Sequence, residues 1–195
     1  IKIRTGNLVS LVESLSEYSR LDNGFRYHME ETDFKEFVEQ YLETCRHDAE
    51  QNQITIAFVY EKETYPVRID REELKRVFDN LFTNTVKYRT SERSHIEISL
   101  KRTLTGTDIE LVFKDDGPGV PEGSLEQIFD SFYRVDDART QSEKGSGIGL
   151  AVVKEIILGH GGKVQAENRE GLAIIIHLPI AGEDIDGKNT DCGRR

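Results

Sequence analysis

Residues 70–88, DREELKRVFDNLFTNTVKY, are predicted to form one long helix with two different faces. Asp70 can cap the first turn, and Glu73 follows three residues later, as a capping box requires. Apolar residues recur every three or four positions, a spacing that places them on one helical face: Leu74, Val77, Phe78, Leu81, Phe82 and Val86. We therefore expect this face to pack on a hydrophobic core.

The other face of this helix is polar. Asn80, Asn84 and Lys87 are spaced four and three residues apart, so they share one side of the helix. A carboxamide oxygen is a neutral ligand that suits Mg²⁺, an ion that takes phosphates and waters as its other ligands. A lysine can give the same phosphates a positive point charge. An ordinary solvated helix face is the alternative, and this motif alone leaves it open.

Helical and strand patterns alternate on both sides of residues 70–88. Further helices are predicted at 5–21, 33–51 and 149–159, and strands at 25–31, 54–60, 65–69, 95–102, 107–114, 163–167 and 172–178. The two strands that flank Gly106 form an expected hairpin, and the last two strands form an antiparallel pair. This order predicts an α+β fold, a two-layer sandwich with helices on one face of a mixed sheet.

Composition excludes several classes of protein. The 195 residues include 26 Lys and Arg against 36 Asp and Glu, and the formal net charge of −10 argues against broad nucleic-acid binding. No apolar run is long enough to span a membrane, and no secretory signal opens the sequence. Cys45 and Cys192 have no partner at zinc or redox spacing, so we expect two reduced thiols.

Two glycine-bearing motifs follow the predicted hairpin. In residues 115–119, DDGPG, glycine allows a sharp turn close to a ligand, and a carboxylate can accept a hydrogen bond from an exocyclic amine such as that of adenine. A plain Asp-Gly turn is the alternative. Residues 145–150, GSGIGL, lead into a predicted helix whose N-terminal N–H groups form an anion site. This second motif lacks the Gly-Lys-Ser/Thr end of a Walker A loop and the preceding strand of a dinucleotide fingerprint.

A long connection separates the two glycine motifs. Aromatic side chains in residues 128–136, IFDSFYRVD, can anchor a loop from which Arg134, Arg139 and Lys144 reach a polyphosphate, although solvated charges are the alternative. The connection is too long for an ordinary loop. Its glycine and charge content predicts a mobile lid over residues 120–146 when no nucleotide is bound.

In this order and at this spacing the motifs resemble the nucleotide-binding domain of the GHKL superfamily, which includes gyrase, Hsp90 and histidine kinases. The closest resemblance is to bacterial sensor histidine kinases, whose N, G1, F and G2 boxes match residues 80–88, 115–119, 129–134 and 145–149. The resemblance implies the Bergerat α/β sandwich, with ATP and Mg²⁺ as cofactors. It also implies transfer of the γ-phosphoryl group of ATP to a histidine.

The resemblance also implies roles for single residues. Asn84 would hold Mg²⁺ with Asn80 beside it, and Lys87 would contact phosphate. Asp115 would accept the adenine amine, and the implied catalytic residues are Asn84, Lys87 and Arg134. The residues expected to bind the nucleotide are Asn80, Asn84, Lys87, Tyr88, Asp115, Gly117, Gly119, Phe132, Arg134, Gly145, Gly147, Ile148, Gly149 and Leu150.

Position 80 separates the members of the superfamily. Members that hydrolyse ATP, and those that phosphorylate serine, carry a glutamate four residues before the magnesium asparagine, whereas this chain carries Asn80. An amide cannot take a proton from water at neutral pH, and a neutral imidazole is already nucleophilic. Asn80 therefore favours a histidine kinase over an ATPase or a serine kinase. A nucleotide-sensing module without phosphotransfer remains an alternative.

None of the five histidines has the acidic neighbour and the following proline of the family's phosphoacceptor. We therefore expect residues 1–24 to be the C-terminal part of the second dimerisation helix of a longer protein. Residues 25–180 would be the catalytic domain and residues 181–195 a disordered tail. The implied partners are the protein's own dimerisation domain, a response-regulator receiver domain and a second copy in a homodimer, with no nucleic acid. The resemblance implies a cytoplasmic domain of a parent protein anchored in the bacterial inner membrane.

Two positions depart from the family pattern. Thr85 stands where the family usually has alanine, and we expect this change to be tolerated. The hairpin turn at residues 169–173, REGLA, lacks the threonine hydroxyl that usually reaches the adenine-binding carboxylate. We expect a water to fill that place and nucleotide affinity to be lower.

Overall fold

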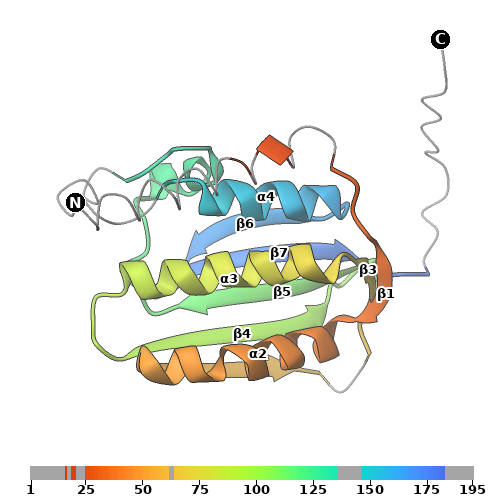
Figure 1. The fold of residues 1–195 in the computed structure, drawn as a ribbon, viewed down its shortest axis with the longest axis horizontal. Coiled ribbons are helices and arrows are strands. Elements are labelled where there is room, and N and C mark those ends of the chain that lie inside the picture. Colours follow the sequence, from red (N-terminus) through yellow and green to blue (C-terminus); the bar gives the residue numbers. More distant parts are fainter. Residues whose placement is uncertain (1–15, 17–18, 21–24, 62–63, 136–145, 183–195) are drawn as a thin grey trace, which may run out of the picture.

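A computed structural model describes residues 16, 19–20, 25–61, 64–135 and 146–182 of the chain. The elements along it are β1 (Glu30–Asp33), α2 (Phe34–Gln51), β2 (Ile54–Tyr60), β3 (Pro66–Ile69), α3 (Arg71–Tyr88), β4 (Ser94–Arg102), β5 (Asp108–Asp115), the 3₁₀ turns η1 (Glu122–Ser124) and η2 (Gln127–Phe129), α4 (Gly149–Gly159), β6 (Lys163–Asn168) and β7 (Leu172–Pro179). They form two layers, with α2, α3 and α4 lying over one face of a sheet (Figure 1).

The main sheet is mixed, with strand order β2-β4-β5-β7-β6. β2 pairs with β4 in parallel, and the other neighbours are antiparallel. β1 and β3 pair antiparallel in a small second sheet, and α2 and α3 begin next to its strands (Figure 1). The α+β sandwich expected from the sequence is confirmed.

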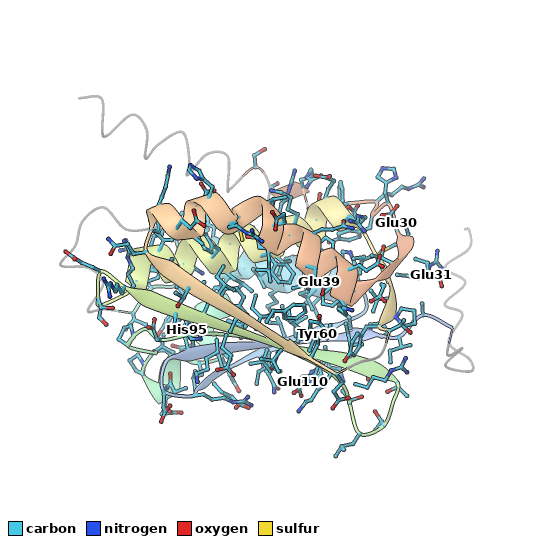
Figure 2. The ribbon with its side chains drawn as sticks, turned by 90° about the horizontal axis from the view of Figure 1, so that it is seen from below. Glu30, Glu31, Glu39, Tyr60, His95 and Glu110 are labelled. Carbon is cyan, nitrogen blue, oxygen red and sulfur yellow. The ribbon has the colours of Figure 1, made fainter. Side chains whose placement is uncertain are left out.

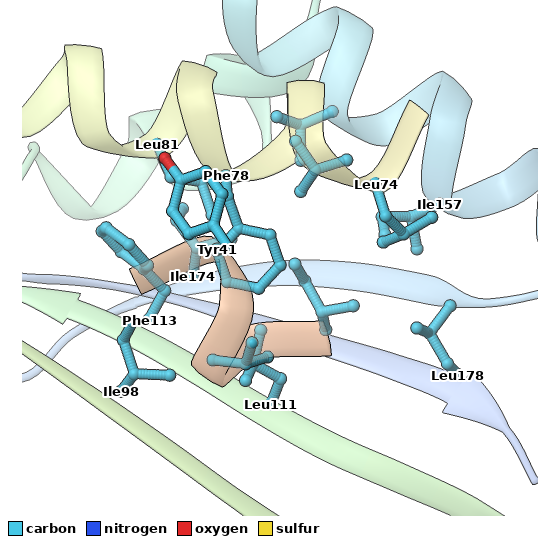
Figure 3. Packing of buried hydrophobic residues seen from close by; sticks show 14 of the residues in the cluster. Tyr41, Leu74, Phe78, Leu81, Ile98, Leu111, Phe113, Ile157, Ile174 and Leu178 are labelled. Atoms are coloured by element: carbon cyan, nitrogen blue, oxygen red, sulfur yellow. The ribbon is translucent and has the colours of Figure 1, made fainter. Parts of the chain in front are cut away.

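The core lies between the helices and the sheet (Figure 3). Phe78 of α3 is fully buried, and its ring centroid lies 5.0 Å from that of Tyr41 and 5.9 Å from that of Phe37, both on α2. The strands present alternate side chains such as Leu111 and Ile174 to the same space. Burying a large apolar side chain contributes about 1.5–3 kcal/mol, so this packing fixes the position of α3.

The opposite face of the sheet carries charged side chains around a small buried cluster of Val112, Ala173 and Ile175. Glu110 lies 2.9 Å from Lys101 Nζ and 3.2 Å from His177 Nε2, and His95 lies on β4 (Figure 2). None of the described helices covers this face. The sequence predicted this arrangement, in which helices cover one face of the sheet.

Both long helices begin after an aspartate cap, and the cap at Asp70 is the predicted one. Asp33 Oδ1 accepts a hydrogen bond from Lys35 N at 3.0 Å, and Asp70 Oδ1 accepts one from Glu73 N at 3.2 Å. Such caps satisfy N–H groups that the first helical turn cannot. The α3 cap is further fixed from α4, because His160 Nε2 accepts a hydrogen bond from Asp70 N at 2.9 Å. Burial lowers the pKa of His160, which keeps the ring neutral and able to accept this bond.

The strand predicted at residues 25–31 is wrong in position, because residues 25–29 are not in a strand and β1 begins at Glu30. Tyr27 packs on the end of α4, where its ring centroid lies 4.8 Å from that of His160. A Cβ on Gly159 would come within 2.2 Å of the Tyr27 ring. The alternating apolar residues of this segment therefore reflect packing on a helix.

Residues 1–15, 17–18, 21–24 and 183–195 lie outside the described residues, so the expected dimerisation helix at 1–24 and the disordered tail at 181–195 stay predictions. Arg20 is described and helical, and its guanidinium lies 2.8 Å from Glu73 of α3. In the part of the chain that the structure describes, no helix has the length and apolar character needed to cross a membrane.

Candidate functional site

A cleft of about 880 Å³ opens where the second half of α3 and the start of α4 meet the loop after β5. Asn80, Asn84 and Lys87 line it from successive turns of α3. The glycine-bearing turn after Asp115 forms a second wall, and residues 146–150 form a third. Segments that are far apart in the sequence therefore converge on one cavity.

Most of the residues predicted to bind a nucleotide line this cleft. They are Asn80, Asn84, Lys87, Tyr88, Asp115, Gly117, Gly119, Arg134, Gly147, Gly149 and Leu150. Phe132 and Ile148 do not line it, because Phe132 is 58% exposed and Ile148 is fully buried in the core. Gly145 lies outside the described residues.

The α3 wall carries polar side chains that have no protein partner among the described residues. Within the described residues, the side chains of Asn84 and Lys87 form no hydrogen bond or ion pair. Partial burial lowers the pKa of Lys87 below its ordinary value. An anion bound beside the ammonium group would offset that loss of hydration, so this wall favours an anionic ligand.

Asn80 is oriented differently from Asn84. Its Nδ2 donates to Arg76 O at 2.9 Å, one turn earlier in α3. Its Oδ1 lies 2.8 Å from the position that a Cβ would occupy on Gly149, at the start of α4. Glycine at position 149 therefore allows α4 to approach α3 closely at the cleft.

Asp115 is held by main-chain groups from two segments. Its Oδ1 accepts a hydrogen bond from Gly117 N at 2.9 Å and one from Leu172 N at 3.2 Å. Burial raises the pKa of Asp115 above its ordinary value, although these two hydrogen bonds act in the opposite direction. Leu172 lies in the turn that lacks the threonine hydroxyl, and its N–H supplies one of these two bonds. The water expected at this turn stays a prediction.

The adjacent carboxylate has a different role. Asp116 accepts hydrogen bonds from the Ser94 hydroxyl and from His95 N, the latter at 2.9 Å. Slight burial acts against these bonds, yet they hold the pKa of Asp116 below its ordinary value. Asp116 thus ties the turn to β4, while Asp115 lines the cleft.

The second glycine motif packs against the loop that precedes it. Gly147 has φ +73°, and a Cβ there would lie 2.9 Å from Phe132 C and from Tyr133 O. Phe132 N also donates to Gly147 O at 2.9 Å. Close backbone approach is therefore one reason for glycine at position 147.

The N-terminus of α4 faces the same cleft. This helix begins at Gly149 without a side-chain cap, and both Gly149 and Leu150 line the cavity. N–H groups in the first turn of a helix have no acceptor within the helix. They form a natural site for an anion.

Part of the predicted lid is anchored. Ile128 and Phe129 are buried in the core, and Tyr133 Oη donates to Ser124 Oγ at 2.9 Å. Phe129 and Tyr133 therefore anchor the loop as the sequence predicted, whereas Phe132 is exposed. This half of the segment forms a wall of the cleft. Residues 136–145, which include Arg139 and Lys144, lie outside the described residues.

Sequence reasoning missed two residues at the rim. Asn168 Oδ1 accepts from Val120 N at 3.0 Å, and its Nδ2 donates to Val120 O at 2.7 Å. No local signal predicts this contact, because it joins the end of β6 to a distant loop. Leu172 follows the conspicuous Gly171, which is the one sequence signal that could have drawn attention to it.

The donor set of the cleft suits one kind of metal site. No group of three or more His, Cys, Asp and Glu side chains among the described residues could hold a metal ion. The α3 wall offers the carboxamide oxygens of Asn80 and Asn84, beside the hydroxyls of Thr83 and Tyr88. These fit an ion such as Mg²⁺ that takes most of its ligands from phosphate and water.

Known proteins share this arrangement. Residues 69–182 match the family described as Histidine kinase-, DNA gyrase B-, and HSP90-like ATPase. Sensor protein kinase WalK of Staphylococcus haemolyticus (strain JCSC1435) is 34% identical over 188 residues, which are 96% of this chain and 30% of that protein. The chain therefore spans less than a third of the length of this relative.

Solved structures of histidine kinases are also similar to this chain. The nucleotide-free catalytic domain of histidine kinase ThkA superposes with TM-score 0.67 at 28% identity, over 78% of this chain and 96% of that one. Histidine kinase AdeS of Acinetobacter baumannii gives TM-score 0.68 at 27% identity, over 89% and 79%. The structure of histidine kinase ThkA in complex with response regulator protein TrrA shows a shared fold, with TM-score 0.74 at 24% identity. The match covers 93% of this chain and 49% of that one. The chain belongs to the histidine kinase-, DNA gyrase B- and HSP90-like ATPase family, and its resemblance to sensor histidine kinases is confirmed.

Proposed function

We propose that this chain is the ATP-binding catalytic domain of a sensor histidine kinase. In this proposal it positions the γ-phosphoryl group of ATP for transfer to a histidine on a dimerisation domain. The observation that carries the proposal is the convergence of three segments on one cleft: the Asn84 and Lys87 face of α3, the turn at Asp115 and the glycine start of α4.

In this proposal Asp115, at one end of the cleft, accepts the exocyclic amine of adenine. Its Oδ1 already receives two main-chain hydrogen bonds, and no protein donor among the described residues reaches its Oδ2. Leu172 and Val120 supply apolar surface nearby for the base. An acceptor beside apolar walls suits a flat ring that carries one amine.

At the other end, Lys87, Arg134 and the start of α4 would bind the phosphates. Asn84 would hold Mg²⁺, with Asn80 beside it, and the bound ion would neutralise part of the phosphate charge. Phosphoryl transfer depends chiefly on positioning and on charge stabilisation. The residues of this cleft therefore suffice for the donor side of the reaction, while the nucleophile comes from another domain.

Hydrolysis of ATP has less support. Among the described residues that line the cleft, Asp115 is the only carboxylate, and it is bound to Gly117 and Leu172. Asn80, beside the proposed metal site, cannot take a proton from water. A histidine acceptor needs no such base, because its neutral imidazole is nucleophilic.

The proposal extends to the whole protein. Its partners would be its own dimerisation domain in a homodimer and the receiver domain of a response regulator. The domain would lie in the cytoplasm, and its parent would be anchored in the bacterial inner membrane. The ThkA complex with its response regulator supports the receiver partner, and the sensor protein kinase relative supports a role in a longer sensor protein. The homodimer, the location and the membrane anchor rest on the resemblance to the family.

Nucleotide titration tests the site. A fluorescent ATP analogue with Mg²⁺ is titrated into the chain and into its Asn84→Ala and Asp115→Ala variants. Each variant should bind at least about tenfold more weakly, since each loses an interaction with a charged group. Glu97→Ala, on the far face of the sheet, is the matched control and should bind normally. Unchanged binding in both cleft variants would remove the site assignment.

Transfer to histidine is tested separately. The dimerisation domain of the parent protein is supplied in trans with ATP labelled at the γ-phosphate. We expect acid-labile phosphate on that domain and phosphate release near background from the chain alone. ATP binding without any labelled histidine would instead indicate a nucleotide-sensing module. Steady phosphate release from the chain alone would indicate an ATPase.

A further inference from the structure

The turn between β6 and β7 supports the Asp115 end of the cleft at two points. We propose that this turn, residues 168–172, is a positioning element that lets the site select a base carrying an exocyclic amine. It acts by orienting the carboxylate of Asp115 and by holding the loop that faces it. The inference rests on the proposed function, because it assumes that Asp115 reads the base.

The first contact fixes the carboxylate. Leu172 N donates to Asp115 Oδ1 at 3.2 Å, and Gly117 N donates to the same oxygen at 2.9 Å. Two main-chain donors on one oxygen set the plane of the carboxylate and leave the other oxygen to accept from a ligand. No side chain of the turn contributes to this orientation, so only the path of the backbone determines it.

Gly171 makes this path possible. Its φ is +141°, and a Cβ there would lie 1.9 Å from Asp115 O and 3.1 Å from Asp116 Cα. The backbone that it meets cannot easily move away, because Asp116 is hydrogen-bonded to Ser94 and His95. A side chain at position 171 would therefore push the turn away from Asp115 and Asp116. The N–H of Leu172 would then no longer reach the Asp115 carboxylate.

The second contact fixes the facing loop. The Asn168 carboxamide binds both main-chain groups of Val120, at 3.0 and 2.7 Å, and its Nδ2 also donates to Glu122 Oε1 at 2.9 Å. Gly119 has φ +67°, and a Cβ there would lie 2.5 Å from Asn168 Oδ1. Because Val120 lines the cleft, Asn168 sets the width of the cleft without touching a ligand.

These two contacts have different consequences for binding. Loss of the Leu172 contact leaves the carboxylate with the Gly117 hydrogen bond alone and should weaken chiefly the interaction with the amine. Loss of the Asn168 contact loosens a wall and should weaken binding of any purine nucleotide. A site that hydrogen-bonds a substrate N–H rejects analogues that lack it, so the amine contact can be measured by comparing two nucleotides.

The experiment compares ATP with purine riboside triphosphate, which lacks the 6-amino group, each with Mg²⁺ in competition with a fluorescent ATP analogue. The chain itself should prefer ATP by at least about fivefold. Gly171→Ala should reduce this preference to less than about twofold, because it weakens ATP more than purine riboside triphosphate. Gly106→Ala is the matched control, because Gly106 also has a positive φ (+77°) but nothing within 4 Å of its Cβ position. Gly106→Ala should keep the full preference.

Asn168→Ala tests the inference independently, even if the Gly171→Ala variant does not fold. It should weaken both nucleotides by similar factors, at least about threefold, and keep the preference for ATP. Thermal unfolding establishes that each variant is folded. A folded Gly171→Ala that keeps the preference would overturn the inference, and so would wild-type affinities in Asn168→Ala. If the unmodified chain binds both nucleotides equally, the assignment of Asp115 fails, and this inference fails with it.

Discussion

The two faces of α3 differ in what their side chains contact. Leu74 and Phe78 face the sheet and are fully buried. Asn84 and Lys87 line the cleft, where neither side chain has a hydrogen bond or ion pair within the described residues. Packing holds the first face in the core, whereas the polar groups of the second face stay available to a ligand. Stability and ligand binding should therefore be separable on a single helix, and each change below tests that separation.

The largest expected effect is on stability. Phe78→Ala should lower the free energy of unfolding by about 3–5 kcal/mol, because it empties a site enclosed by Tyr41 and Phe37. Asn84→Ala should change it by no more than about 0.5 kcal/mol, although it should abolish tight nucleotide binding. Urea unfolding of both variants measures the difference. Similar losses of stability in both would mean that the two faces are not independent.

A smaller effect is expected at the base of α3, where a charged group is buried. The Glu73 side chain is 4% exposed and pairs with Arg20 at 2.8 Å, while Arg76 lies 3.6 Å away. Arg20→Ala should cost about 1–2 kcal/mol, less than a fully buried pair would, because Arg20 is partly exposed and Arg76 remains.

The matched control for this pair is Arg46→Ala. Arg46 and its partner Glu43 both have 66% of the side chain exposed, so its removal should change stability by no more than about 0.5 kcal/mol. The same urea unfolding measures both variants. If Arg20→Ala has no larger effect than Arg46→Ala, then the ion pair of Arg20 with Glu73 does not stabilise the first turn of α3.

Local patterns predicted most of the fold. The Asp70 cap and the apolar spacing of α3 depend on neighbours within a turn or two, so the sequence alone contains them. The strand predicted at 25–31 failed because period-two alternation has more than one cause. Tyr27 is partly buried against the end of α4, and nothing near it in the sequence indicates that contact.

The site was predictable as a set of motifs but less so as a set of contacts. Family resemblance pointed to Asn84 and Asp115, and both line the cleft. It also pointed to Ile148, whose side chain is buried in the core. The hydrogen bonds between the Asn168 side chain and Val120 join residues 48 positions apart, and they involve only main-chain atoms of Val120. No sequence pattern records such a contact.

The cleft face of α3 should also respond to pH. Burial lowers the pKa of Lys87, so this ammonium loses its proton at a pH below that of an ordinary lysine. ADP affinity should fall by about two- to fivefold as the pH rises through that lowered pKa, because the phosphates lose a positive partner. Isothermal titration across the alkaline range measures this.

Lys87→Arg is the control, because a guanidinium stays protonated throughout this range. Its ADP affinity should not show the alkaline decline. The stability of the nucleotide-free chain should move in the opposite direction. With a folded-state pKa below the unfolded one, stability rises with pH between the two values. An equal alkaline loss of affinity in Lys87→Arg would assign the titration to another group.

The smallest effect is expected at Thr85, which lies between the two faces of α3. Its side chain is buried, and its Oγ1 donates to Leu81 O at 3.3 Å, one turn earlier. Thr85→Ala removes a methyl group from the core but also removes a hydroxyl that competes for a helix carbonyl, and alanine has the higher helix propensity. These contributions oppose each other, so stability should change by less than about 1 kcal/mol. Nucleotide affinity should not change, because Thr85 does not line the cleft. The same fluorescent analogue measures this affinity. A clear loss of affinity in Thr85→Ala would show that packing beneath Asn84 controls its orientation. The two faces of α3 would then not be independent at Thr85.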